Sequence, residues 1–133
     1  MVLACDLNES TRGIINKRTL SMMKKTSYII NVARGDVCVE EDLFNSLKNK
    51  NIAGAAIDTW WIYPDRPKDG GKPEKAPRPS SFPFHKLDNV IMTPHNSAHT
   101  LESDLRRSKS ILDNLLDFKK GKKPSGFVFY GNK

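Results

Sequence analysis

The stretch Ile29-Ile30-Asn31-Val32-Ala33-Arg34-Gly35-Asp36 decides the fold that this sequence predicts. An apolar segment of β-strand type, Tyr28–Asn31, runs directly into a loop that carries a cation, with no proline between them. A buried strand that ends in this way places a charge at the edge of a sheet. In open α/β sheets, ligands bind at the carboxyl ends of the strands. The guanidinium of Arg34 is therefore the first candidate functional group.

Two further segments have the same form. Ala53–Asp58 and Asn89–His95 each run through small or branched apolar residues and end on a polar side chain, Asp58 in the first and His95 in the second. If the three strands are parallel, their carboxyl ends meet at one edge of the sheet. The sequence thus predicts that Arg34, Asp58 and His95 share this edge.

Helical patterns alternate with the strand patterns along the first half of the chain. Asn16 is a good helix N-cap, and acidic residues open the next helix while basic residues close it, as the helix dipole favours. Alternation of this kind, with short connections, predicts an α/β fold with a parallel sheet. We expect four strands, at Val2–Cys5, Tyr28–Asn31, Ile52–Ile57 and Val90–Met92, and three helices, from Asn16 to Met23, Glu40 to Asn51 and Thr100 to Phe118.

The domain layout follows from where this alternation stops. Residues 1–98 form the α/β part, interrupted by a long surface loop over 60–88 that is rich in proline, glycine and lysine. Loops of this length in compact domains are usually functional or disordered. Residues 99–120 form the last helix, and 121–133 form a tail.

Composition and charge narrow the classes of function. A chain of 133 residues suits one domain of ordinary size. The net charge is +7, but the basic residues are dispersed and lack interleaved aromatic residues, unlike those of a nucleic-acid-binding module. Positive charge also draws in anionic substrates. We expect a small anionic substrate and no nucleic-acid partner.

The sequence also bears on the compartment. No apolar run approaches the ~20 residues that span a bilayer, and Met1–Asp6 lacks the basic start and long apolar stretch of a secretory signal. The two cysteines, Cys5 and Cys38, are too few and too far apart for a disulfide framework or a zinc site. We expect a cytoplasmic protein with no membrane partner and no bound metal.

Five ordered motifs carry a resemblance to a known family. Leu7–Asn16 (LNESTRGIIN), Met23–Lys24, Ile30–Asp36 (INVARGD), Gly54–Asp58 (GAAID) and Thr93–Ala98 (TPHNSA) together resemble the D-isomer-specific 2-hydroxyacid dehydrogenases. The resemblance covers most of residues 2–119. It implies a partial Rossmann-like sheet, the second half of an NAD-binding domain, because the sequence contains no G-x-G-x-x-G turn. The implied reaction is hydride transfer between a nicotinamide and C2 of a 2-hydroxy or 2-oxo acid.

The resemblance assigns catalytic roles to three residues. Arg34 matches the cation that holds the substrate carboxylate, for which a planar guanidinium is well suited. His95 matches the acid/base that moves the hydroxyl proton. The family usually has a glutamate before a proline to orient this histidine, but here Tyr63 precedes Pro64. Our hypothesis is that the phenol orients His95 without supplying negative charge, with Asp65 as an alternative after a shift of register.

The resemblance also implies a cofactor, NAD with NADP left open, and a dimer in the full-length form. The residues implied at the cofactor are Asp6, Thr11, Val32, Arg34, Asp58, His95, Ser97 and Ala98. The formate dehydrogenases of the same family use a neutral amide where the usual acid stands, so formate chemistry remains open. A different class of function also remains open: a non-catalytic, truncated half-domain that acts through a partner chain.

Overall fold

The computed structural model describes residues 1–64 and 78–125. The chain divides into two compact units, Met1–Ser97 and Ala98–Lys133, and each is described by itself. The candidate residues other than Ala98 belong to the first unit. Asp65, the alternative partner for His95, lies outside the described residues.

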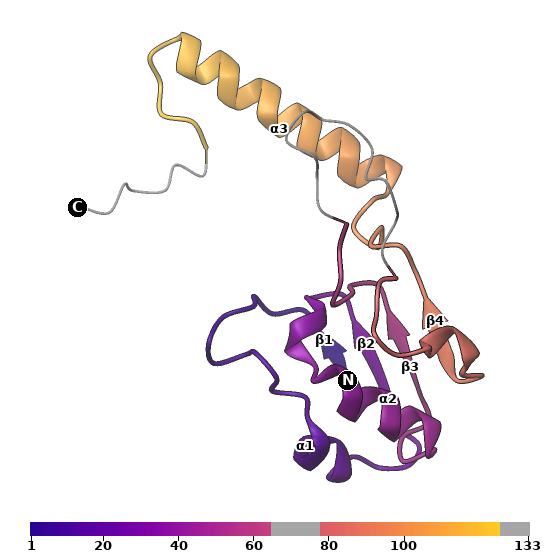
Figure 1. The fold of residues 1–133 in the computed structure, drawn as a ribbon. Coiled ribbons are helices and arrows are strands. Elements are labelled where there is room, and N and C mark those ends of the chain that lie inside the picture. Colours follow the sequence, from indigo (N-terminus) through magenta and orange to yellow (C-terminus); the bar gives the residue numbers. More distant parts are fainter. Residues whose placement is uncertain (65–77, 126–133) are drawn as a thin grey trace. The chain divides into compact units, whose positions relative to one another are not determined.

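The first unit is built on a four-stranded parallel sheet (Figure 1). Its strands lie in the order in which they occur in the sequence, so each pairs with the next one along the chain. This confirms the expected α/β class and parallel sheet. The strands are β1 (Val2–Leu3), β2 (Tyr28–Asn31), β3 (Gly54–Ile57) and β4 (Val90–Met92).

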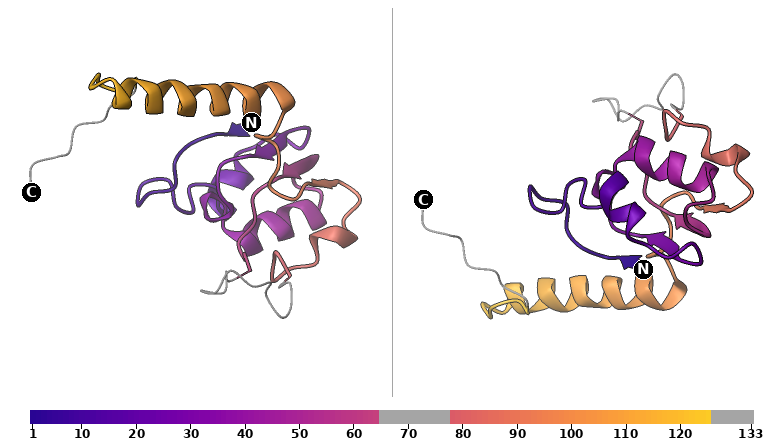
Figure 2. Two further views of the ribbon diagram at one scale, coloured as in Figure 1. Left: turned by 90° about the horizontal axis from the view of Figure 1, so that it is seen from above. Right: turned by 90° about the horizontal axis from the view of Figure 1, so that it is seen from below.

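Two helices connect the first three strands. α1 (Lys17–Ser21) and α2 (Glu40–Lys48) contact each other and lie on one face of the sheet (Figure 2). This placement is expected because right-handed crossovers between strands that advance in one direction put their helices on one face. Asn16 caps α1 as predicted, through bonds from the Arg18 and Thr19 amides.

The bounds of four elements differ by two or more residues from the sequence expectations. α1 ends at Ser21 rather than Met23, α2 at Lys48 rather than Asn51, and β1 at Leu3 rather than Cys5. β3 begins at Gly54, while Ile52 is fully buried in the loop before it. At Ile52, apolar character extends beyond the hydrogen-bonded strand because a residue that flanks an element can also pack into the core, whereas Cys5 and Met22, beyond the ends of β1 and α1, are exposed.

The segment expected to be a surface loop over 60–88 contributes some of its described aromatic residues to the core, although many of its other described residues are exposed. Trp60 and Phe84 are 7% and 1% exposed, and a short 3-10 helix, η2 (Phe84–Lys86), forms there. Phe84 stacks on Trp61 at 5.4 Å between ring centroids and meets Phe44 of α2 edge-on at 5.3 Å. These aromatic contacts pack the segment against α2 and the core. Its proline and glycine content did not predict this packing.

The second unit contains α3 (Leu101–Lys119). Thr100 caps it through a bond from the Ser103 amide, and the chain leaves it through Gly121, whose φ of 69° favours glycine. Its bounds agree with the expected helix within one residue. Among the described residues, no helix is long and apolar enough to cross a membrane.

Candidate functional site

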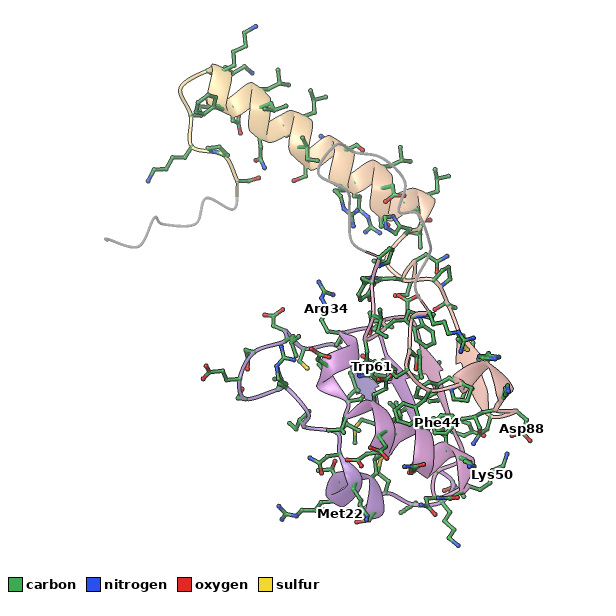
Figure 3. The ribbon with its side chains drawn as sticks, in the orientation of Figure 1. Met22, Arg34, Phe44, Lys50, Trp61 and Asp88 are labelled. Carbon is green, nitrogen blue, oxygen red and sulfur yellow. The ribbon has the colours of Figure 1, made fainter. Side chains whose placement is uncertain are left out.

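Arg34 lies in the turn that follows β2. Its side chain is exposed and extends from the carboxyl end of the strand (Figure 3). Nη1 donates to the carbonyl of the neighbouring Ala33 at 2.8 Å. Among the described residues, the guanidinium makes no other hydrogen bond, so most of its donors are available to a ligand.

The backbone on both sides of Arg34 is fixed by close contacts. Before it, the Asn31 side chain accepts from the Ala33 amide at 3.1 Å and donates to the Arg34 carbonyl at 3.0 Å. After it, Gly35 lies so close to the chain at Trp60 that a Cβ there would be 2.4 Å from the Trp60 carbonyl oxygen. A larger residue than glycine does not fit at this point.

His95 lies in the turn after β4. Its φ of 56° is in the left-handed region, which non-glycine residues rarely adopt. Such a conformation persists only when the surroundings fix it. Here the Trp60 indole donates to the Thr93 carbonyl at 2.9 Å, and Asp58 binds residues on both sides of His95.

Asp58 directly follows β3 and is 4% exposed. One carboxylate oxygen accepts from the Thr93 hydroxyl at 2.5 Å and the Asn96 amide at 3.0 Å. The other accepts from the Ser97 hydroxyl at 2.6 Å and the Ser97 amide at 3.1 Å. Burial acts to raise the pKa of Asp58, but these four bonds outweigh it and lower the pKa to about 2. The carboxylate therefore stays charged and ties the His95 turn to β3.

Tyr63 and His95 lie together, as the hypothesis for Tyr63 requires. The phenolic oxygen is 3.1 Å from Nδ1 of His95, and it accepts from the Trp60 amide at 3.0 Å. A phenolic oxygen can accept two hydrogen bonds and donate one. Tyr63 can therefore donate to Nδ1 when that atom is bare and accept from it when it carries a proton.

The loop implied to hold the cofactor is folded against the Arg34 turn. The Thr11 hydroxyl donates to the Asp6 carbonyl at 2.6 Å and closes the loop. Arg12 pairs with Asp36, and the Gly13 amide donates to the Asp36 carbonyl at 2.8 Å. These two contacts attach the loop to Asp36, two residues after Arg34.

The remaining sequence candidates divide into those the structure brings together and those it does not. Val32 is exposed two residues before Arg34, and Ser97 joins the Asp58 network. Ala98 begins the second unit, where its carbonyl accepts from the Ser103 hydroxyl. Of the other histidines, His85 is exposed in η2 and His99 pairs with Asp104.

Sequence reasoning missed two residues that support this edge of the sheet, Asn31 and Trp60. Asn31 belongs to the motif Ile30–Asp36, which by itself indicates no role for this side chain, although an amide at a core-facing strand position is unusual. Trp60 falls in the segment expected to be a surface loop, and its sequence context does not distinguish a core residue from a ligand platform. The structure places it in the core, with its indole nitrogen on the His95 turn.

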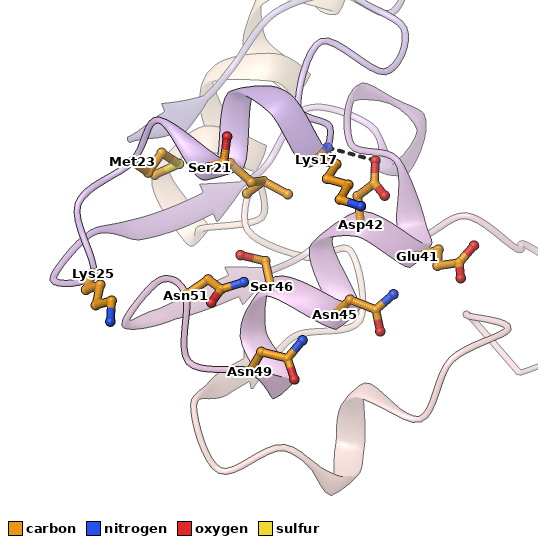
Figure 4. Close-up of a pocket in the computed structure, with 11 residues that line it drawn as sticks. Lys17, Ser21, Met23, Lys25, Glu41, Asp42, Asn45, Ser46, Asn49 and Asn51 are labelled. Atoms are coloured by element: carbon orange, nitrogen blue, oxygen red, sulfur yellow. Dashed lines mark hydrogen bonds between the residues drawn. The ribbon is translucent and has the colours of Figure 1, made fainter.

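A cavity of about 710 Å³ lies elsewhere, between α1 and α2 (Figure 4). Its lining includes Lys17, Lys25, Asp42 and Asn51, and the Lys17 amide donates to the Asp42 carboxylate at 2.8 Å. Lys25 and Asn51 precede β2 and β3, so this hollow lies toward the amino ends of the strands. It contains none of the residues at the carboxyl edge.

Comparisons with known proteins agree with this geometry. The family model described as D-isomer specific 2-hydroxyacid dehydrogenase, NAD binding domain, matches residues 1–97. The chain is 37% identical to a glyoxylate reductase of Thermofilum pendens over 122 residues, 92% of the chain and 32% of the reductase. It is 32% identical to a formate dehydrogenase of Neurospora crassa over 139 residues, 98% of the chain and 34% of that enzyme.

Among solved structures, a D-isomer specific 2-hydroxyacid dehydrogenase from Lactobacillus delbrueckii ssp. bulgaricus, in its NAD complexed form, is similar to the chain with a TM-score of 0.75 and 28% identity. The similarity covers 96% of the chain and 39% of that protein. The chain thus spans about a third of the length of the relatives it matches.

Proposed function

Since the chain belongs to the D-isomer specific 2-hydroxyacid dehydrogenase family, we propose that it supplies the substrate-anchoring and proton-transferring part of an NAD-dependent oxidoreductase acting on 2-hydroxy and 2-oxo acids. The observation that carries the proposal is the hydrogen-bonded pair Tyr63–His95, held at the same edge of the parallel sheet as Arg34. This edge offers a cation for a carboxylate and an imidazole for a hydroxyl proton.

The nicotinamide half of NAD fits the residues present at this edge. Val32 offers an exposed apolar side chain, and Ser97 and Asp58 offer a donor and acceptors beside His95. All four positions on the Asp58 carboxylate are occupied, so a carboxamide would reach it by replacing one of its present donors. We propose the cofactor contacts named above, from Asp6 to Ala98, with the dinucleotide supplying or accepting the hydride.

Arg34 binds the substrate through its carboxylate. The guanidinium has a planar set of donors that matches a carboxylate with two parallel bonds. Fixing this end of the substrate sets the direction in which its C2 oxygen points. The turn after β4 would then present His95 to that oxygen.

His95 moves the hydroxyl proton at Nε2. In oxidation, Nε2 accepts the proton of the C2 hydroxyl while Nδ1–H donates to the Tyr63 oxygen. In reduction, the doubly protonated ring returns the proton from Nε2 to the C2 oxygen, and Tyr63 continues to accept at Nδ1. Tyr63 supports both steps because its oxygen can accept from Trp60 and from His95 together.

The experiment that tests the proposal compares substitutions at the two proposed catalytic residues in the polypeptide that contains this chain. Glyoxylate reduction with NADH is followed by absorbance. Arg34→Gln should raise the KM for glyoxylate, and His95→Gln should lower kcat. The proposal would be contradicted if the wild-type protein turned over none of the three 2-oxo acids glyoxylate, pyruvate and hydroxypyruvate.

A second candidate, formate oxidation, is favoured by one observation: the partner of His95 is a neutral phenol rather than a carboxylate. Formate has no hydroxyl proton to transfer, so it does not require a charged partner for the histidine. NAD reduction with formate, compared with lactate and glycerate in the same preparation, distinguishes the two candidates.

The compartment and the assembly state are part of the proposal. Both cysteines are free thiols, which suits the reducing cytoplasm. We propose a cytoplasmic enzyme that forms a dimer in its full-length form. Sedimentation velocity on the full-length polypeptide tests the dimer.

A further inference from the structure

One side chain on the core-facing side of the sheet is polar where its neighbours are apolar. Asn31 is the last residue of β2 and lies in register between Leu3 of β1 and Ile57 of β3. It is fully buried, with 0% of its surface exposed. Burying an amide is unfavourable unless its hydrogen bonds are satisfied. Core packing alone therefore does not explain an asparagine at this position.

The hydrogen bonds of the Asn31 side chain all go to the segment that follows β2. Its oxygen accepts from the Ala33 amide, and its nitrogen donates to the Arg34 carbonyl. The same nitrogen is 3.8 Å from the sulfur of Cys38. An asparagine that bonds the backbone two and three residues ahead closes a local turn. The carboxamide thus fixes the chain up to Arg34.

The position of the Arg34 guanidinium depends on this backbone. Its Nη1 donates only to the adjacent Ala33 carbonyl within the part of the chain that the structure describes, so no distant side chain holds it. Gly35, pressed against Trp60, fixes the chain on the other side. Arg34 is therefore held between two fixed points, of which Asn31 is the one that bonds Arg34 itself.

We propose that Asn31 is a positioning residue that holds the Arg34 turn so that the guanidinium meets the substrate carboxylate. This inference rests on the proposed function for its effect on the substrate, but not for its effect on the turn. A misplaced guanidinium would weaken binding of the carboxylate while leaving cofactor binding intact. An asparagine with a purely structural role would affect stability without this selectivity.

Asn31→Leu is the informative substitution, and Asn89→Leu is its matched control. Leucine has the size and apolar character of the neighbours of Asn31 in the register row, but makes neither bond. The Asn89 side chain also donates to two backbone carbonyls, those of Leu47 and Ala53, both at 3.2 Å. It does so beside the amino ends of β3 and β4, far along the strands from Arg34.

The first measurement is amide hydrogen exchange by NMR on the chain itself. The Val37 amide donates to the Arg34 carbonyl at 3.2 Å and reports on the turn. Asn31→Leu should lower the protection of Val37 by at least about tenfold relative to β3, and Asn89→Leu should not. Unchanged protection in Asn31→Leu overturns the proposal. Asn31→Ser, which is smaller and cannot span to the Arg34 carbonyl, gives the same test if the leucine variant does not fold.

The second measurement is made on the polypeptide that shows turnover. Asn31→Leu should raise the KM for the 2-oxo acid on the order of tenfold with an unchanged KM for NADH, while Asn89→Leu leaves both unchanged. Equal effects of the two substitutions on the 2-oxo acid overturn the role toward substrate. If the wild type turns over no 2-oxo acid, the proposed function fails, and the exchange measurement still decides whether Asn31 holds the turn.

Discussion

At the scale of single residues, the most distinctive feature is the phenol at Nδ1 of His95. A tyrosine in this place provides a hydrogen bond of 3.1 Å but no negative charge at neutral pH. Its position is fixed by the Trp60 amide, which belongs to the same aromatic segment. The orientation of the histidine therefore depends on local hydrogen bonding rather than on an ion pair.

Tyr63→Phe removes this bond and keeps the ring. We expect kcat for the 2-oxo acid to fall roughly threefold to tenfold, the size of one neutral hydrogen bond, with an unchanged KM for NADH. Tyr28→Phe is the matched control because Tyr28 is exposed on the open side of β2. Unchanged kinetics in Tyr63→Phe would remove Tyr63 from the site.

Asp58 makes a measurable prediction about pH. Its pKa is about 2 in the folded chain and 3.8 in the reference state, so its charged form stabilises the fold above pH 4. This contribution, about 2 kcal/mol, is lost as the pH falls from about 4 through 2. Urea unfolding across this range should show a smaller loss of free energy in Asp58→Asn than in the wild type.

Glu9→Gln, which removes a carboxylate from an exposed loop position, controls for the change in net charge. It should leave the pH dependence of the unfolding free energy close to that of the wild type. A similar loss between pH 4 and 2 in wild type and Asp58→Asn would mean that the four bonds to Asp58 do not govern its protonation.

At the scale of elements, the contact between the Arg34 turn and the segment after β3 depends on one glycine. A Cβ at Gly35 would lie 2.4 Å from the Trp60 carbonyl oxygen and 2.8 Å from the Trp61 nitrogen. Both are backbone atoms, so relief requires the two segments to separate. This contact joins the turn that presents Arg34 to the segment that carries Tyr63.

Gly35→Ala should therefore destabilise the first unit by about 1–3 kcal/mol, as overpacking does. Gly121→Ala is the comparison. No atom lies within 4 Å of a Cβ added there, but φ is 69°, so this substitution tests backbone strain without a steric clash and should cost about 1 kcal/mol or less. Thermal and urea unfolding measure both. A smaller cost at Gly35 than at Gly121 would show that the two segments move apart easily.

At the scale of the whole molecule, we propose that the chain contributes one side of a dinucleotide site. The sequence has no G-x-G-x-x-G turn, and such a turn is what presents a helix N-terminus to the pyrophosphate. The residues at the carboxyl edge are suited to the nicotinamide and the substrate. We therefore expect the complete dinucleotide to need pyrophosphate contacts from outside these 133 residues.

We predict that the isolated chain binds NAD weakly or not at all in isothermal titration calorimetry. The expected reason is the loss of the pyrophosphate contacts, which contribute much of the affinity for a dinucleotide. Micromolar affinity would contradict this prediction and would also argue against the alternative of a non-catalytic half-domain acting through a partner chain.

The sequence by itself determined the approximate positions of the strands and helices and the turns that carry Arg34, Asp58 and His95. These features are local, because the alternation of strand and helix patterns, the helix caps and the turns after strands depend on residues that are close in the sequence. The family motifs added the pairing of Tyr63 with His95. One boundary was wrong at Ile52 because this residue packs into the core without joining the strand that follows it.

Only the tertiary structure decided how these turns are held. Asp58 is bound by residues 35 to 39 positions further along the chain, and Trp60 reaches the carbonyl of Thr93. The burial of Asn31 likewise follows from its place between β1 and β3. Contacts of this kind arise when β3 and β4 pair and the aromatic segment folds back on α2. They depend on the assembled sheet, so no local pattern in the sequence encodes them.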